Sequence, residues 1–126
     1  TGLAHRIEAG SDFYVMPSRF EPCGLNQLYS MRYGTVPVVR CTGGLADSVS
    51  HASPENLDGG GANGFVFDDY SAEAFATILQ MAVEIYCNEQ ETWTRLMQNG
   101  MNGDYSWKKS ALKYERVMSG ILKSGF

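Results

Sequence analysis

The sequence predicts an α/β fold in which a small parallel sheet is flanked by helices. Short apolar runs at residues 12–16 and 36–39 enclose a segment with helical periodicity, which is the order of a βαβ unit with parallel strands. The chain has 126 residues, 44% of them hydrophobic, which suffices for one compact domain and leaves no room for a second of similar depth. We therefore expect a single domain, residues 1–126.

The predicted first strand follows the end of a helix. Residues 3–7 place apolar side chains at helical spacing, and Gly10 is a common type of helix stop. Residues 12–16 (DFYVM) favour a strand. Pro17 ends this strand, because proline cannot donate a hydrogen bond to a sheet ladder.

The helix of the βαβ unit is predicted over residues 24–33, where apolar residues recur at i, i+3 and i+4 and Gly34 provides the stop. Residues 36–39 (VPVV) form an unbroken apolar run, which indicates a strand buried on both faces. A right-handed crossover should join the two strands.

The middle of the chain is rich in glycine. The sequence predicts a turn at residues 42–44 (TGG), a loop at residues 50–63 with three successive glycines, and a third strand at residues 64–67 (GFVF). The 14 glycines of the chain exceed the usual share and concentrate in these turns.

Three helices are predicted in the remainder. Ser71 is a good N-cap for a helix of about fifteen residues, a shorter helix around Trp93 should stop near Gly100, and Ser106 should cap the last helix. The apolar stripe predicted to be buried on the first of these helices consists of Ala72, Phe75, Ala76, Leu79, Ala82, Val83 and Tyr86. The apolar face predicted on the last helix consists of Trp107, Ala111, Tyr114, Met118, Ile121 and Leu122.

Composition argues against several classes of function. Ten Lys and Arg against 14 Asp and Glu give a net charge of −4, so no excess positive charge is available for nucleic acid or anionic lipid. No apolar run approaches the roughly 20 residues needed to cross a bilayer. The three cysteines match neither a disulfide framework nor a zinc site. We expect a soluble protein with reduced thiols and no metal site, which binds neither nucleic acid nor membrane.

Ligands of parallel α/β sheets bind beyond the carboxyl ends of the strands, which selects the segments after the first two strands. In the first segment, Glu21 precedes Gly24, which should open the helix. N–H groups at a helix N-terminus attract anions, and Gly24, which lacks Cβ, would let a pyrophosphate come close. In the second segment, Thr42, Gly43 and Gly44 offer a hydroxyl and two small residues. Together the two segments could line one cleft.

Structural roles remain open for the same residues. Glycine-rich turns often bind nothing, and a single carboxylate such as Glu21 often caps a turn. Cys23 has no histidine nearby in sequence to activate it, so it is expected to be a small buried side chain rather than a nucleophile. His5 is expected to fix the packing of the first helix or to bind a ligand, and His51 to be exposed in a flexible loop.

The segments AHRI at residues 4–7, PSRFEPCGLNQLY at residues 17–29 and TGGLAD at residues 42–47, with the last helix that starts at Ser106-Trp107, resemble together the C-terminal domain of bacterial glycogen synthases and plant starch synthases, glycosyltransferase family 5. The resemblance spans almost the whole chain. It implies the Rossmann-like C-terminal half of a GT-B fold. It also implies transfer of a glucosyl unit from ADP-glucose to an α-1,4-glucan acceptor with retention of configuration, without a cofactor.

The resemblance assigns roles by position. Glu21 matches the acidic residue that contacts the donor glucose and supports the developing oxocarbenium charge. Cys23, Gly24 and Leu25 match the segment whose amides meet the sugar hydroxyls and the pyrophosphate of ADP-glucose or ADP. Asn26 stands where a threonine is usual, which alters a polar contact to the phosphate. His5 matches a segment close to the cleft, without an assigned role.

The resemblance further implies that an N-terminal domain, with the residues that clamp the phosphates and stack on adenine, precedes Thr1. Catalysis in a two-domain cleft depends on both walls, so the chain is expected to be a fragment that is inactive alone. Its compartment would be the cytoplasm, or the plastid of a plant or alga. Two alternatives stay open: another retaining GT-B transferase that uses UDP-glucose, and a non-catalytic module that binds nucleotide or glucan.

Overall fold

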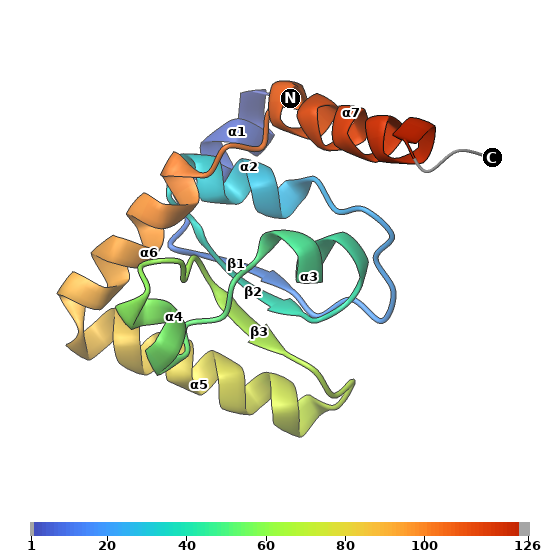
Figure 1. The fold of residues 1–126 in the computed structure, drawn as a ribbon. Coiled ribbons are helices and arrows are strands. Elements are labelled where there is room, and N and C mark those ends of the chain that lie inside the picture. Colours follow the sequence, from blue (N-terminus) through green and yellow to red (C-terminus); the bar gives the residue numbers. More distant parts are fainter. Residues whose placement is uncertain (1, 124–126) are drawn as a thin grey trace.

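The computed structural model describes residues 2–123 and places three parallel strands in the order β1-β2-β3 at the centre of the described chain (Figure 1). The strands are β1 (Phe13–Met16), β2 (Val36–Arg40) and β3 (Phe65–Phe67). Val38 in the middle strand pairs with Val15 on one side and with Phe65 on the other. The predicted α/β class and the three predicted strands are confirmed.

The helix α2 (Asn26–Tyr33) connects the first two strands, which confirms the βαβ unit. Gly34, at φ +84°, ends this helix as predicted. The helix begins two residues later than the sequence predicted, after Leu25 at the N-cap position. Gly24 therefore does not open the helix but belongs to the turn before it.

Helices cover both faces of the sheet, because successive residues of each strand point to opposite sides. They are α3 (Gly43–Ser48), α5 (Ala72–Asn88) and α6 (Gln90–Asn102) together with α2. Val38 packs in the cluster formed with α5 and α6, whereas the adjacent Val39 packs in the cluster formed with α2 and α3. Both valines are fully buried, as the unbroken apolar run of this strand predicted.

Two short helices lie where the sequence predicted only a turn and a loop. α3 begins within the predicted turn at residues 42–44, and α4 (Pro54–Asp58) interrupts the predicted loop at residues 50–63. The hydroxyl of Ser53 accepts a hydrogen bond from the Asn56 N–H at 3.3 Å, and Pro54 occupies the first turn. A serine cap followed by proline is a helix-start signal, and the nearby glycines obscured it.

The cap of α5 was predicted correctly and its buried face only in part. Ser71 Oγ accepts a hydrogen bond from the Ala74 N–H at 3.1 Å. The buried residues of this helix are Ile78, Ala82 and Ile85. Val83, assigned to the buried stripe, is exposed. The helix is apolar on most of its circumference, so periodicity alone could not select the face that meets the sheet.

Helix α6 passes through Gly100, where the sequence predicted its end, and continues to Asn102. A Cβ atom added to Gly100 would lie 3.2 Å from the Cβ of Met31 in α2. This glycine therefore allows a close approach of two helices and does not stop one.

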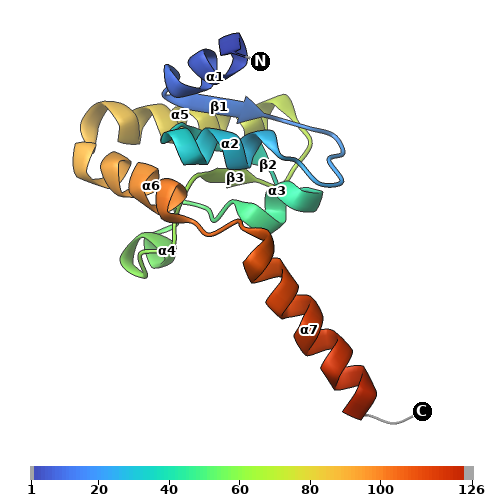
Figure 2. The same cartoon turned by 90° about the horizontal axis from the view of Figure 1, so that it is seen from above.

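The terminal helices α1 (Gly2–Ala9) and α7 (Trp107–Lys123) contribute no described residue to the two buried core clusters. α1 contains no buried residue, and α7 leaves the body of the molecule (Figure 2). α7 begins after Ser106 as predicted, yet three residues of its predicted apolar face, Trp107, Tyr114 and Met118, are 84%, 70% and 63% exposed. The side chain of Leu122 lies outside the described residues.

Candidate functional site

The two loops selected from the sequence lie against each other at the carboxyl edge of the sheet. A Cβ atom added to Gly43 would overlap the carbonyl oxygen of Glu21, and one added to Gly44 would overlap the carbonyl oxygen of Cys23. Only glycine fits at these two positions while the loops keep this arrangement. The two loops therefore lie side by side, and the cleft that they were expected to line stays a prediction.

A tight turn holds the Glu21 carboxylate. The N–H of Gly24 donates a hydrogen bond to Glu21 Oε1 at 3.1 Å, and Gly24 itself has φ +65°. A Cβ atom added to Gly24 would lie 2.7 Å from Oε1 of Gln27. The absence of a side chain is thus explained by the turn and by Gln27, whereas the close approach of an anion to Gly24 stays a prediction.

Helices α2 and α3 both begin beside this turn. Leu25 precedes α2 and Thr42 precedes α3, and neither helix start carries a side-chain cap. N–H groups in the first turn of a helix lack intrahelical acceptors and carry partial positive charge. Cys23 and Asn26 are exposed at this edge, so the prediction that Cys23 is a buried side chain is wrong: it lies in the surface turn before α2 and not in the core. The turn combines one carboxylate with polar backbone groups at the surface.

Leu25 also borders a separate groove. Its side chain is 57% exposed, and it lines a hollow of about 490 Å³ together with Tyr29 and Trp107. An apolar side chain in this place contributes shape and no charge.

His5 lies apart from the loops. Its Nδ1 is 3.2 Å from the hydroxyl of Tyr33, in the last turn of α2, whereas the Glu21 turn adjoins the first turn of that helix. The structure therefore does not bring His5 to the other predicted site residues, and the contact with Tyr33 supports its alternative role in packing α1.

Arg40 is a residue of this edge that sequence reasoning missed. It ends β2, donates from Nη1 to the Arg19 carbonyl at 2.9 Å and from Nε to the Asp68 carbonyl at 3.0 Å. Its guanidinium carbon lies 5.4 Å from the centre of the Tyr70 ring, within range of a cation–π contact. The signal was a charged residue directly after the apolar run VPVV. Arg40 joins the segments that follow all three strands.

The thiol of Cys41 lies beside Asp68. Desolvation, together with the hydrogen bond to the Asp68 carboxylate and its charge, raises the pKa of this thiol. Since the thiolate is the reactive form, the neighbour disfavours a nucleophilic role. All three cysteines, which fall within the described residues, are free.

The prediction that His51 is exposed in a flexible loop is wrong. Its Nδ1 accepts a hydrogen bond from the Val66 N–H at 3.2 Å, and its backbone forms a bridge with Gly64. Burial lowers the pKa of the ring, so the neutral form that accepts this bond is favoured. His51 therefore joins the segment after α3 to strand β3.

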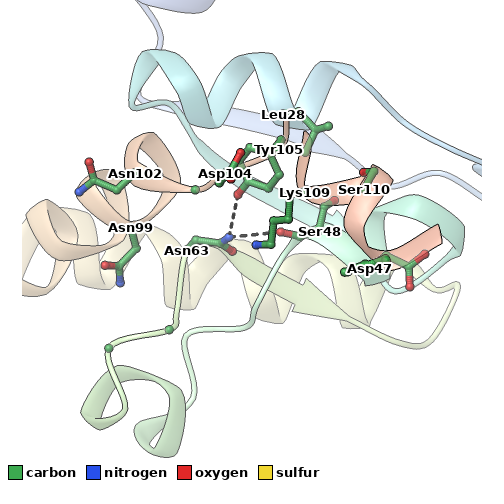
Figure 3. A pocket seen from close by; sticks show the side chains of 14 residues that line it. Leu28, Asp47, Ser48, Asn63, Asn99, Asn102, Asp104, Tyr105, Lys109 and Ser110 are labelled. Carbon is green, nitrogen blue, oxygen red and sulfur yellow. Dashed lines mark hydrogen bonds between the residues drawn. The ribbon is translucent and has the colours of Figure 1, made fainter. Parts of the chain in front are cut away.

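The lining of a further hollow includes neither Glu21 nor Gly24 nor Gly43 (Figure 3). It has a volume of about 550 Å³ and is bordered by the ends of α3 and α6, residues 60–63 and the start of α7. Asn63 donates to the Ser48 carbonyl at 3.2 Å and to the Tyr105 hydroxyl at 3.4 Å across it. The charged side chains that line the hollow are two acidic and two basic residues, namely Asp47, Asp104, Lys109 and Lys113.

Residues 2–123 contain no group of three or more His, Cys, Asp or Glu side chains arranged to hold a metal ion. Within the same part of the chain, no helix is both long and apolar enough to span a membrane.

Comparison with protein families matches residues 3–100 to the family described as glycosyl transferases group 1. Over 121 residues the chain is 54% identical to a protein named glycogen synthase from Desulforudis audaxviator, covering 96% of this chain and 24% of that protein. It is 56% identical over 112 residues to a glycogen synthase from Thioalkalivibrio sulfidiphilus, covering 89% and 23% of the two chains. The chain thus spans about a quarter of the length of these curated relatives.

A solved structure with the same fold is described as the catalytic domain of starch synthase IV from Arabidopsis thaliana bound to ADP and acarbose. Its TM-score is 0.84 at 40% sequence identity, and the match covers 94% of this chain and 24% of the other.

Proposed function

This chain belongs to the glycosyl transferases group 1 family, and from that premise we propose that it is the donor-binding part of a retaining glucosyltransferase of the glycogen and starch synthase type. The reaction is the transfer of glucose from ADP-glucose to an α-1,4-glucan. The observation that carries the proposal is the identity of 54% to a glycogen synthase over 96% of this chain, a stretch that contains both loops at the carboxyl edge of the sheet.

In this proposal Glu21 lies beside the donor glucose. Its carboxylate stabilises the positive charge that develops on the sugar in the transition state. The hydrogen bond from the Gly24 N–H at 3.1 Å fixes the carboxylate and leaves its second oxygen to face the donor.

The pyrophosphate of ADP-glucose is proposed to lie at the start of α2, against backbone N–H groups of Cys23, Leu25 and Asn26. A start without a side-chain cap and the partial charge of a helix N-terminus support this placement. Thr42, Gly43 and Gly44 form the adjoining wall. The ADP in the starch synthase IV structure is consistent with a nucleotide at this fold.

The rest of the active site is proposed to come from a longer protein. The chain covers 24% of its relatives, and it presents apolar surface that a further domain could bury. Val15 of the edge strand β1 is 42% exposed, and Leu3 and Ile7 of α1 are 70% and 60% exposed. The exposed apolar face of α7 is a separate surface, on the other side of the molecule from α1 (Figure 2). We propose that an N-terminal domain packs against the surface of β1 and α1 and supplies the glucan acceptor site. Such an enzyme would act in the cytoplasm, or in the plastid of a plant or alga.

The test is Glu21→Gln in the full-length protein. The amide oxygen of glutamine can still accept the bond from Gly24, so the turn persists while the charge is lost. Turnover number should fall about a hundredfold, the typical effect of removing one well-placed electrostatic group, and KM for ADP-glucose should change little. Glu73→Gln, an exposed carboxylate on α5, is the matched control and should transfer glucose normally.

Donor and metal requirements separate the proposal from its alternatives. Transfer from ADP-glucose should exceed transfer from UDP-glucose, and an excess of chelator should leave the rate unchanged because backbone amides hold the phosphates. Preference for UDP-glucose would indicate the related transferase, and binding of ADP without any transfer by the full-length protein would indicate a recognition module.

A further inference from the structure

Gln27 is a buried carboxamide beneath the turn that carries Glu21. Its side chain is fully buried, although it lies only one residue from the start of α2. Nε2 lies 2.9 Å from the Gly24 carbonyl oxygen and 3.1 Å from Ser48 Oγ at the end of α3. One side chain therefore contacts the turn of Glu21 and the end of α3, the helix that begins with Gly43 and Gly44.

The hydrogen bonds fix the orientation of this carboxamide. The Ser48 hydroxyl donates its only hydrogen to the Gly44 carbonyl at 2.6 Å, so toward Gln27 it can only accept. The Gly24 carbonyl is also an acceptor. Both positions require the NH₂ group of Gln27, and a flipped amide would place its oxygen against two acceptors.

Oε1 of Gln27 is buried and has no hydrogen-bond partner among the described residues. Burying an unpartnered carbonyl oxygen costs free energy, and an apolar side chain of similar size would fill the same volume without that cost. What Gln27 supplies and an apolar residue cannot is the pair of donors to Gly24 and Ser48.

Gln27 is connected to Glu21 through the two peptide groups of Gly24. Gln27 holds the Gly24 carbonyl, and the Gly24 N–H holds Glu21 Oε1 at 3.1 Å. From Ser48 the connection continues to Gly44, which touches the backbone of the same loop at Cys23. The contacts close a ring in which Gln27 joins the turn to α3.

We propose that Gln27, with Ser48 as its partner, is the positioning residue that holds the Glu21 carboxylate in place for glucosyl transfer. The inference rests on the proposed function in one respect, namely that Glu21 acts on the donor sugar. Gln27 does not touch the substrate and acts through Gly24.

The experiment uses four single variants of the full-length protein and one double variant, which combines Gln27→Met with Ser48→Ala. Gln27→Met keeps the length of the side chain and removes both donors. Ser48→Ala removes the partner hydroxyl, and Ser48→Thr retains it. Gln98→Met, at an exposed position on α6, is the matched control for the loss of a glutamine.

With ADP-glucose and glycogen, we expect the turnover number of Gln27→Met to fall at least tenfold while KM for the donor changes less than threefold. Ser48→Ala should lower the turnover number in the same way, and Ser48→Thr should restore it to within threefold of wild type. The double variant should be no worse than Gln27→Met alone, because both substitutions interrupt one connection. Gln98→Met should match wild type.

Hydrogen exchange at the Gly24 amide gives a readout that does not depend on catalysis. Exchange at least tenfold faster in Gln27→Met than in Gln98→Met supports the inference, even if the wild-type protein transfers no glucose and the proposed function fails. Gln27→Met with wild-type turnover and unchanged Gly24 exchange overturns it. Should Gln27→Met not fold, equal exchange and equal turnover in Ser48→Ala and Ser48→Thr would overturn it as well.

Discussion

Two glycine-rich segments of this chain look alike in sequence and differ in structure. In the segment at the start of α3, added Cβ atoms at Gly43 and Gly44 would overlap the carbonyl oxygens of Glu21 and Cys23. In the segment after α4, Gly60 and Gly61 have open space, with nothing within 4 Å of an added Cβ. Gly43 and Gly44 allow two backbone segments to contact each other, whereas Gly60 and Gly61 lie in an exposed turn.

The difference shows that a high glycine content indicates where a turn lies but does not show why glycine is required there. At Gly44 the reason is a neighbour that is distant in sequence, the loop of Glu21. At Gly60 the reason is local, since φ is +70°, a conformation that side chains disfavour. Substitution by alanine should therefore separate the two segments.

The largest effect is expected for Gly44→Ala. The new methyl group would overlap the Cys23 carbonyl, so the Glu21 loop must move away from α3. We expect a loss of about 3 kcal/mol or more in the free energy of unfolding, measured by urea unfolding with fluorescence of the buried Trp93. A loss below about 1 kcal/mol would mean that the loops separate without cost and would remove the contrast between the segments.

Gly24→Ala should have the next largest effect, because it tests a glycine with both a local and a distant constraint. Its φ of +65° disfavours alanine, and the added Cβ would press on the Gln27 carboxamide. We expect about 2 kcal/mol of destabilisation. Gln27→Ala vacates that space, so Gly24→Ala should destabilise the Gln27→Ala protein less than it destabilises wild type. Equal destabilisation in the two backgrounds would assign the cost to the backbone conformation alone.

The pH dependence of stability tests the hydrogen bond that His51, ahead of the second segment, accepts from Val66 beyond it. Burial lowers the pKa of His51, so below the pKa of the unfolded chain, about 6.5, the folded state binds fewer protons than the unfolded state. The stability contributed by neutral His51 is present above that pH and is lost as pH falls toward the lower folded pKa.

Unfolding measured from pH 7.5 to 5.5 should accordingly show a steeper fall in wild type than in His51→Gln, which cannot be protonated. His5→Gln is the control, and the effect should be smaller than that of either glycine variant. Parallel pH profiles for wild type and His51→Gln would contradict the anchoring role of this histidine.

The smallest effect is expected for Gly61→Ala. The methyl group meets no atom, and alanine reduces the entropy of the unfolded chain. The free energy of unfolding should stay within about 0.5 kcal/mol of wild type. Gly60→Ala is the comparison and should cost about 1 kcal/mol, because its positive φ is strained despite the open space. Equal results for the two variants would contradict this account of the turn.

Helices α5 and α7 show what the sequence pattern could and could not predict about a helix. Both have 17 residues, and both were predicted as amphipathic helices after a serine. The helices exist, and Ser71 and Ser106 precede them. Which face of α5 is buried could not be predicted, since most of its surface is apolar, and the predicted face of α7 is exposed in the described chain. Amphipathicity says that a face will be covered and does not say by what.

The residues of the candidate site likewise divide into those that the sequence predicted and those whose contacts it did not. The segment from Glu21 to Leu25 and the pair Gly43-Gly44 were selected from sequence, because strand ends and helix starts can be located there. Arg40 and His51 were not assigned these contacts, and His5, included as a candidate, lies against Tyr33 instead. Their roles depend on partners 15 or more residues away, as in the bond from the Val66 N–H to His51.

By itself the sequence determined the βαβ order, the stop at Gly34, the cap at Ser71 and the resemblance to glycogen and starch synthases. The stop and the cap depend on residues within a few positions of one another, where backbone sterics and local hydrogen bonds decide the outcome. The βαβ order and the resemblance follow from the order of such local patterns along the chain. Only the tertiary structure decided that Gly44 touches Cys23, that Gln27 joins Gly24 to Ser48, and that His51 anchors β3. Such contacts form when the folded chain brings distant segments to van der Waals distance. The residue pattern of one segment therefore does not predict which other segment will contact it.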